Sequence, residues 1–395
     1  MTAYNILINN VKQKKIKFYF VLSITRSNST TLALALSQAP EIGRQINMPF
    51  FFESVPLNHE FHHKGLEEEM PDTLSAEMVA NRINKIINPI LQNDRTISTI
   101  IHDHFDFLTR EEYLNLLREL GNDFIFCFRD PKIQFLSHIL SSTNYFLIKN
   151  PSINNKKVFS YSDLLYLLHV FKNNHDNFSD KFNEIVKLKG IELNKFDESD
   201  DRTIFNDGFD SYIKSNFNTD SVDMTNSKFD WIKEKFYFLL NLQKNELELS
   251  WKNALNTFNF LNSNVKVDKP NIIDKPNIIM IDGDKLVRNP EVSLKAIIDR
   301  IDGISFTRDM IDNWQKFTGK DFVCFASRIM SSGSTNNWNG ECQNSNKIKI
   351  LNDERPFLTS DLLMEDFNLV LNQAQEVYNF FTLISIGRIQ KLEKI

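Results

Sequence analysis

Residues 16–38, IKFYFVLSITRSNSTTLALALSQ, place an apolar run, a short polar loop and an apolar-periodic segment directly after one another. This order predicts a strand over 16–24, a loop over 25–31 and a helix that starts at the end of that loop. The backbone N–H groups of the loop and the positive end of the helix then face one point, where an anion can bind. The pattern G-x-x-x-x-G-K-[ST] is absent, which argues against ordinary ATP or GTP hydrolysis. We therefore expect a phosphate site without a Walker lysine.

A second segment, FIFCFRDPKIQFLS over 124–137, reads as a buried strand, then Arg129-Asp130-Pro131-Lys132, then a helix that carries Ser137. Together with the loop TRSNST, it resembles the two nucleotide-binding segments of the sulfotransferases that use PAPS (3'-phosphoadenosine-5'-phosphosulfate), with bacterial and cytosolic members as the closest types. The loop departs from the PRSGST form of that family, because Thr25 replaces Pro and Asn28 replaces Gly. Asn tolerates the left-handed backbone that a Gly would adopt.

A third stretch, 278–314, resembles a late segment of the same family: a strand, an acidic-Leu turn, a Pro, a long helix, a Gly-Ile step and a Trp-bearing helix. Asn289-Pro290-Glu291 is a helix-start signal, with Pro in the first turn and an acid near the positive end of the dipole. Gly303 is the expected C-cap. The apolar face expected for this helix consists of Val292, Ala296, Ile297 and Ile301.

The remaining pattern extends this organisation. Helical periodicity at 75–93 and 109–120 alternates with strand runs at 96–102 and 124–128, which predicts a parallel sheet covered by helices. Ligands of such sheets bind at the carboxyl ends of the strands, where both phosphate segments fall. The resemblance implies a three-layer α/β, sulfotransferase-like P-loop fold. We expect a single domain over 1–395 that contains a mostly helical insertion at 141–262.

Composition limits the classes of function. The chain has 395 residues and a net charge of −5, so nothing points to nucleic-acid binding. No segment has the length of a membrane span, and the three cysteines are too few and too scattered for a disulfide framework or a zinc site. Cys127 falls in a predicted core strand, where a small buried hydrophobe is the ordinary role. We expect a cytoplasmic protein.

The resemblance implies roles for the residues that match the two nucleotide-binding motifs. The first loop would hold the 5'-phosphosulfate of PAPS, with Arg26 stabilising the oxygen that leaves, and Arg129 and Ser137 would bind the 3'-phosphate. Two other roles stay open: a loop hydroxyl as a helix cap, and Arg129 in an ion pair with Asp130 or another carboxylate. The cofactor-binding residues predicted in the first loop are Arg26, Ser27, Asn28, Ser29, Thr30 and Thr31.

The base that removes the acceptor's proton has more than one candidate. The strand at 97–101 ends in His102-Asp103-His104, which looks like the Lys-Thr-His stretch of cytosolic sulfotransferases. That alignment makes His104 the base and puts His102 where the Lys would be; histidine suits the task because its pKa is near neutrality. An alignment with bacterial members selects Asp103 instead. Glu53 is a further candidate, from a loop in which Met48 takes the place of the family's Glu.

The sequence therefore predicts an enzyme that moves a sulfuryl group from PAPS to a hydroxyl or amine of an unidentified acceptor. The alternatives are an inactive relative that binds PAPS or its product PAP (3',5'-bisphosphoadenosine), and a P-loop kinase. No metal is expected, because His59, His62 and His63 show no metal-ligand spacing with the histidines at 102 and 104.

Overall fold

The computed structural model describes residues 2–42, 51–52, 76–91, 96–105, 111–148, 158–193, 212, 230–263, 276–314, 347–348, 350 and 358–392. The chain divides into two compact units. The first comprises Met1–Arg129, Ser250–Asp353 and Val377–Ile395, and the second comprises Asp130–Leu249 and Glu354–Glu376. The single domain with an insertion at 141–262 stays a prediction.

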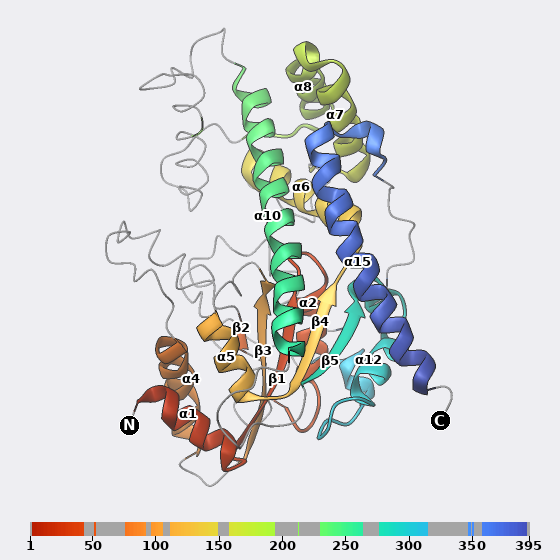
Figure 1. Cartoon of the computed structure of the whole chain (residues 1–395). Helices are drawn as coiled ribbons and strands as arrows, with labels where there is room; N and C mark the ends of the chain where they lie inside the picture. Colours follow the sequence, from red (N-terminus) through yellow and green to blue (C-terminus); the bar gives the residue numbers. More distant parts are fainter. Residues whose placement is uncertain are drawn as a thin grey trace. The chain divides into compact units, whose positions relative to one another are not determined.

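The first unit contains the sheet and the helices around it (Figure 1). Its described elements are α1 (Ala3–Lys12), β1 (Ile16–Ser23), α2 (Ser29–Ser37), β2 (Phe51–Phe52), α4 (Ala76–Leu91), β3 (Ile97–His104), α5 (Glu111–Leu120), β4 (Asp123–Phe128), β5 (Asn277–Asp282), α11 (Gly283–Arg288), α12 (Pro290–Ile298) and η4 (Arg308–Met310). Those of the second unit are α6 (Pro131–Leu147), α7 (Tyr161–Asn173), η3 (His175–Asn177), α8 (Phe178–Lys189) and η6 (Ser360–Leu362). Two longer helices have residues in both units: α10 (Trp231–Asn262) and α15 (Glu365–Leu392).

The sheet is parallel, with the strand order β2-β3-β1-β4-β5. Its four longer strands match the apolar runs that the sequence predicts, and β2 adds two residues at one edge. The predicted α/β class, a parallel sheet surrounded by helices, is confirmed. The sulfotransferase-like form of this fold stays a prediction.

The strand order places a switch point at β1. The connection that leaves β1 leads to β2 on one side of it, whereas the connection that leaves β4 leads to β5 on the other side. Connections that diverge in this way open a crevice at the carboxyl ends of the two strands, which is where open α/β sheets bind ligands. The loop that follows β1 and the end of β4 both lie at this carboxyl end of the sheet.

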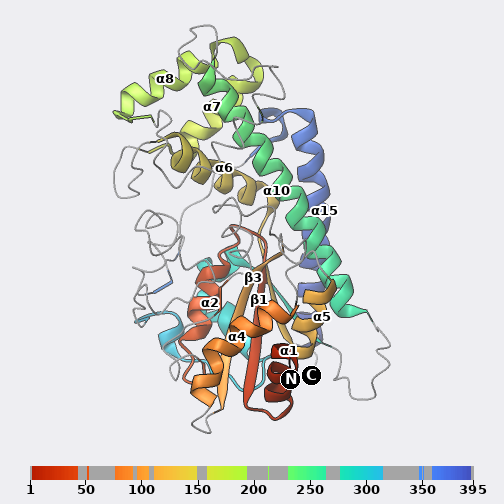
Figure 2. The same cartoon turned by 90° about the vertical axis from the view of Figure 1, so that its left-hand side faces the viewer.

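Alternate residues of β1 supply the two faces of the sheet, because successive side chains of a strand point to opposite sides. Tyr19 and Val21 pack in a cluster that includes α2, α11 and α12. On the other face the Phe20 ring stacks on Phe124 with centroids 4.6 Å apart. The ring of Phe126 on that face lies 6.3 Å from Phe381 of α15. Figure 2 shows α2 and α5 on opposite faces of the sheet.

The apolar face predicted for the helix after Asn289 is partly wrong. Val292 is 70% exposed and Ala296 is exposed too, whereas Ile297 and Ile301 are buried as predicted. The buried side of α12 is instead completed by Leu294 and Ile298, which lie three and four residues from their buried neighbours. The helix also ends earlier than predicted, at a C-cap at Asp299, while Gly303 (φ 81°) lies in the turn beyond it.

In the second unit, α6 begins at the predicted Asp-Pro step. The Asp130 side chain accepts hydrogen bonds from the backbone N–H groups of Lys132 and Ile133, at 2.9 and 3.3 Å, and Pro131 occupies the first turn. These contacts are the standard start of a helix.

Among the residues described above, no helix combines the length and apolar content needed to cross a membrane.

Candidate functional site

The loop between β1 and α2 has a distinct backbone. Arg26 and Asn28 both have φ of 65°, in the left-handed region that residues other than glycine rarely adopt. Asn28 therefore has the left-handed backbone that asparagine was expected to tolerate in place of the family's Gly. Asn28 is the N-cap residue of α2, but its side chain makes no capping bond; Nδ2 donates instead to the backbone oxygen of Gly283 at 3.1 Å.

The start of α2 is thus held from outside the helix, and its first-turn N–H groups are not capped by the Asn28 side chain. Ser29, Thr30 and Thr31 are the first three helical residues, so none of them is the N-cap. The N–H groups of a first helical turn lack intrahelical acceptors. Such a helix end can bind an anion, and the phosphate site that the sequence places here stays a prediction.

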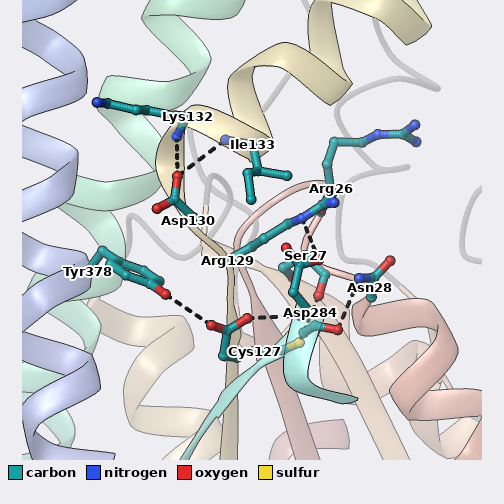
Figure 3. Close-up of polar contacts among 12 residues, drawn as sticks. Arg26, Ser27, Asn28, Cys127, Arg129, Asp130, Lys132, Ile133, Asp284 and Tyr378 are labelled. Carbon is teal, nitrogen blue, oxygen red and sulfur yellow. Dashed lines mark hydrogen bonds and ion pairs between the residues drawn. The ribbon is translucent and has the colours of Figure 1, made fainter. Parts of the chain in front are cut away.

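Arg129 joins the loop to the end of β4 (Figure 3). Its Nη1 donates to the backbone oxygen of Arg26 at 3.0 Å, so the two predicted nucleotide-binding segments converge. Its Nε lies 2.9 Å from Oδ1 of Asp284, as an ion pair without hydrogen-bond alignment. Of the alternatives open for Arg129, the structure shows an ion pair with another carboxylate. Asp130 is not that partner, because it caps α6.

Two acids of the β5–α11 junction surround this arginine. Burial raises the pKa of the Asp284 carboxyl above its ordinary value; Arg129 offsets part of this rise, and the charge of Asp282 adds to it. Asp282 is the N-cap of α11 and accepts a hydrogen bond from the Asp284 N–H at 2.8 Å. Its second oxygen accepts one from the Tyr378 hydroxyl at 3.0 Å. The junction is therefore tied both to the loop and to α15.

Gly283 packs against the loop backbone. A Cβ atom at this position would lie 1.7 Å from the backbone oxygen of Ser27 and 3.3 Å from the Asn28 Cβ. The same Ser27 oxygen accepts from the Cys127 thiol at 3.2 Å. Burial raises the pKa of Cys127 to about 12, so the thiol stays protonated and can donate. The predicted role of Cys127 as a buried residue is confirmed, and it also supports the loop.

The Ser27 side chain is fully buried, and its hydroxyl has no hydrogen-bond partner among the described residues. An unpaired buried hydroxyl costs free energy unless a partner such as a ligand satisfies it. The Arg26 side chain, by contrast, is part-exposed and points away from Asp284 (Figure 3).

The carboxyl end of β3 brings both candidate histidines beside the loop. Ser23, the last residue of β1, pairs in register with His104 on one side and with Cys127 on the other. The Ser23 hydroxyl lies 2.8 Å from Nδ1 of His104 and 3.4 Å from Nε2 of His102. The two imidazole rings meet edge to face with centroids 5.3 Å apart.

These neighbours differ in their suitability as a base. His102 is fully buried, and its pKa lies well below the ordinary value because of burial and the nearby His104. The buried carboxylate of Asp103 accepts from the Tyr113 hydroxyl at 2.8 Å and from the His104 N–H at 2.9 Å, so both of its oxygens are engaged. His104 is part-exposed. Of these three side chains, only that of His104 is accessible to solvent.

The other predicted site residues stay predictions. Ser137 is part-buried on α6 of the second unit, and Glu53 and Met48 lie outside the described residues, as do His59, His62 and His63. Within the described ranges, no group of three or more His, Cys, Asp or Glu side chains could hold a metal ion.

Sequence reasoning missed four residues that shape the site: Ser23, Tyr113, Gly283 and Asp284. Three of them carried a signal. Ser23 is the polar end of an apolar strand, and Gly283 and Asp284 directly follow the apolar run that ends at Asp282. Comparisons with protein-family models, with curated proteins and with solved structures found no match for this chain.

Proposed function

We propose that this protein is a sulfotransferase that binds PAPS at the β1–α2 loop and the end of β4, and transfers its sulfuryl group to a hydroxyl or amine. The observation that carries the proposal is the bond from Arg129 Nη1 to the Arg26 backbone oxygen. It brings together two segments that are 103 positions apart and that the family resemblance assigns to one nucleotide.

The residues present fit an anionic donor. The first turn of α2 and the unpartnered Ser27 hydroxyl offer donors to the 5'-phosphosulfate, and Arg26 adds a positive charge in the same loop. Two of the three nitrogens of Arg129 make the contacts with Arg26 and Asp284. The third, Nη2, leaves donors for a 3'-phosphate.

Sulfuryl transfer is an in-line displacement in which negative charge grows on the phosphate oxygen that leaves. PAPS supplies an activated sulfuryl group. The protein has to stabilise the leaving oxygen, align the acceptor and take up its proton. Arg26 is the residue we assign to the leaving oxygen. His104 is the base, because it is part-exposed while His102 and Asp103 are buried.

Ligand binding is tested by thermal shift with PAP, with ADP and with ATP plus magnesium. A ligand present at about 100 times its Kd stabilises the native state by about 2.7 kcal/mol. We expect PAP to stabilise the protein and the shift to shrink in Arg26→Ala. Arg308→Ala is the matched control, because Arg308 is exposed and pairs with Glu291 on the surface. A preference for magnesium ATP would favour the kinase alternative instead.

Catalysis is tested by following label from PAPS into a mixed pool of hydroxyl and amine acceptors. His104→Ala should lower transfer by about 10²-fold or more, as for loss of a general base, while PAP still stabilises the variant. Glu53→Ala tests the other candidate in parallel. PAP binding without transfer to any acceptor would identify the protein as an inactive relative.

A further inference from the structure

The Ser23 hydroxyl meets three polar groups at the carboxyl end of β3. It lies 2.8 Å from Nδ1 of His104, 3.4 Å from Nε2 of His102 and 3.3 Å from the backbone oxygen of Asp103. Ser23 is fully buried, so water does not compete for these contacts. All three groups belong to β3, which pairs with β1 in parallel register through this point.

The hydrogen-bonding capacity of the Ser23 hydroxyl determines which group donates in each of the three contacts. A hydroxyl has one hydrogen and two lone pairs. The Asp103 carbonyl oxygen can only accept, so the hydroxyl hydrogen goes to that oxygen if all three contacts are hydrogen bonds. Both imidazoles must then donate to Ser23, His102 from Nε2 and His104 from Nδ1. In a neutral imidazole the other ring nitrogen carries no hydrogen.

We propose that Ser23 is a positioning residue that holds neutral His104 in the tautomer with hydrogen on Nδ1, leaving the Nε2 lone pair to take the acceptor's proton. The catalytic part of this inference rests on the proposed function; the tautomer itself does not.

The proton balance is simple in this arrangement. The hydrogen of the acceptor hydroxyl moves to Nε2 as the acceptor oxygen bonds to sulfur, while the bond from sulfur to the phosphate oxygen breaks and PAP leaves with that electron pair. The imidazolium that results keeps its Nδ1–H on Ser23. His102 stays neutral because burial lowers its pKa and the charge on His104 lowers it further. Only one of the two histidines therefore takes up the proton.

The tautomer is read by long-range ¹H–¹⁵N NMR of protein labelled at histidine, at a pH about two units above the ordinary imidazole pKa. Signals of His104 are assigned by their loss in His104→Gln. We expect the Nδ1–H form in the native protein and in Ser23→Thr, which keeps the hydroxyl. Ser23→Ala should shift His104 toward the Nε2–H form. Ser293→Ala, which removes a buried hydroxyl from α12, should leave the His104 signals unchanged.

An Nε2–H form of His104 in the native protein overturns the inference. This NMR measurement depends neither on the folding of a variant nor on a substrate. In the transfer assay, Ser23→Ala should lower kcat by about 10²-fold with little change in the KM for PAPS, and Ser23→Thr should restore it. Absence of transfer in the native protein with the Nδ1–H form present overturns the proposed function alone. Full kcat in Ser23→Ala would refute the positioning role.

Discussion

A buried ion pair between Arg129 and Asp284 helps to hold the candidate site together. The Arg129 and Asp284 side chains are 4% and 13% exposed, and the contact between them is 2.9 Å. Removing one partner of such a pair leaves an uncompensated buried charge, whereas the desolvation of both ions already weakens the intact pair. The pair therefore matters more for the arrangement of the loop than for net stability.

A double-mutant cycle with Arg129→Gln and Asp284→Asn tests this description. Each single substitution should lower the unfolding free energy by about 3 kcal/mol, and the double variant should lose less than the sum. Urea unfolding provides the measurement. The matched control is the pair Arg308–Asp312, 65% and 37% exposed, where the coupling should stay below about 1 kcal/mol. Additive losses at Arg129 and Asp284 would contradict the pairing.

A buried histidine gives the second prediction at this scale. The pKa of His102 is lowered in the folded protein, so the unfolded chain binds a proton that the folded protein does not. The stability that the neutral imidazole contributes is complete above the ordinary pKa and is lost as the pH falls from there toward the folded value. Over that window His102 should add a slope of about 1.4 kcal/mol per pH unit. In His102→Gln, the unfolding free energy measured by denaturation at a series of pH values should depend less steeply on pH. An unchanged slope would show that another group causes the pH dependence.

At the scale of elements, the ring of Phe381 in α15 packs on the sheet. Phe381 is fully buried, and its ring lies 5.7 Å from Phe128, 5.8 Å from Phe258 and 6.2 Å from Trp251. Its neighbour Phe380 is 40% exposed. Adjacent helical residues point about a quarter turn apart, so one packs on the sheet while the other meets solvent.

Substitution of these two neighbours separates packing from helix propensity. Phe381→Ala should lower the unfolding free energy by about 3–5 kcal/mol, because it removes a ring from a packed core. Phe380→Ala makes the same substitution one residue earlier, and should lower the unfolding free energy by well under half of the loss in Phe381→Ala. Chemical denaturation of both variants measures the difference. Equal losses would show that α15 does not pack on the sheet through Phe381.

The junction of β5 and α11 supports the anion loop through Gly283. Its φ is not in the left-handed region, so the requirement for glycine here is one of space. Gly283→Ala would press a methyl group into the Ser27 backbone and should lower the unfolding free energy by about 3 kcal/mol. It should also abolish the thermal shift that PAP produces. Gly303→Ala is the comparison, because its Cβ would have more room and its φ of 81° should cost about 1 kcal/mol. Retained PAP binding in Gly283→Ala would separate this junction from the site.

At the scale of the whole molecule, one unit holds the contacts that define the candidate site. Arg26, Arg129, Asp284, Ser23 and His104 all belong to the first unit. Ser137 belongs to the second. The first unit is itself assembled from three stretches of chain, so the site depends on segments that are distant in sequence.

Hydrogen exchange over the full chain tests where the nucleotide binds. PAP should slow exchange at 24–31, at 127–129 and at 282–284, because bound phosphates occupy the loop N–H groups and hold the junction closed. Amides of α7 and α8 provide the internal reference and should be unchanged. Protection confined to those reference helices would place the ligand elsewhere and refute the assigned site.

What the sequence determined by itself is local. The apolar run of β1, the polar loop and the start of α2 follow from residue order, and the Asp130-Pro131 start of α6 follows from the capping chemistry of two neighbours. The left-handed backbone at Asn28 agrees with the tolerance of asparagine for it, whereas the same backbone at Arg26 follows from no sequence signal. Prediction failed at α12, where Val292 is exposed, because periodicity alone does not say which of two adjacent stripes meets the core.

Only the tertiary structure decided the partners. Arg129 meets Asp284, Gly283 meets the loop backbone, and Ser23 meets His104 across contacts that span tens to hundreds of residues. The order of the strands brings these groups together, and that order is a property of the assembled sheet. The physical reason is that periodicity and capping act within a few residues, whereas burial and hydrogen bonding are satisfied by whichever chain segment packs nearest in space.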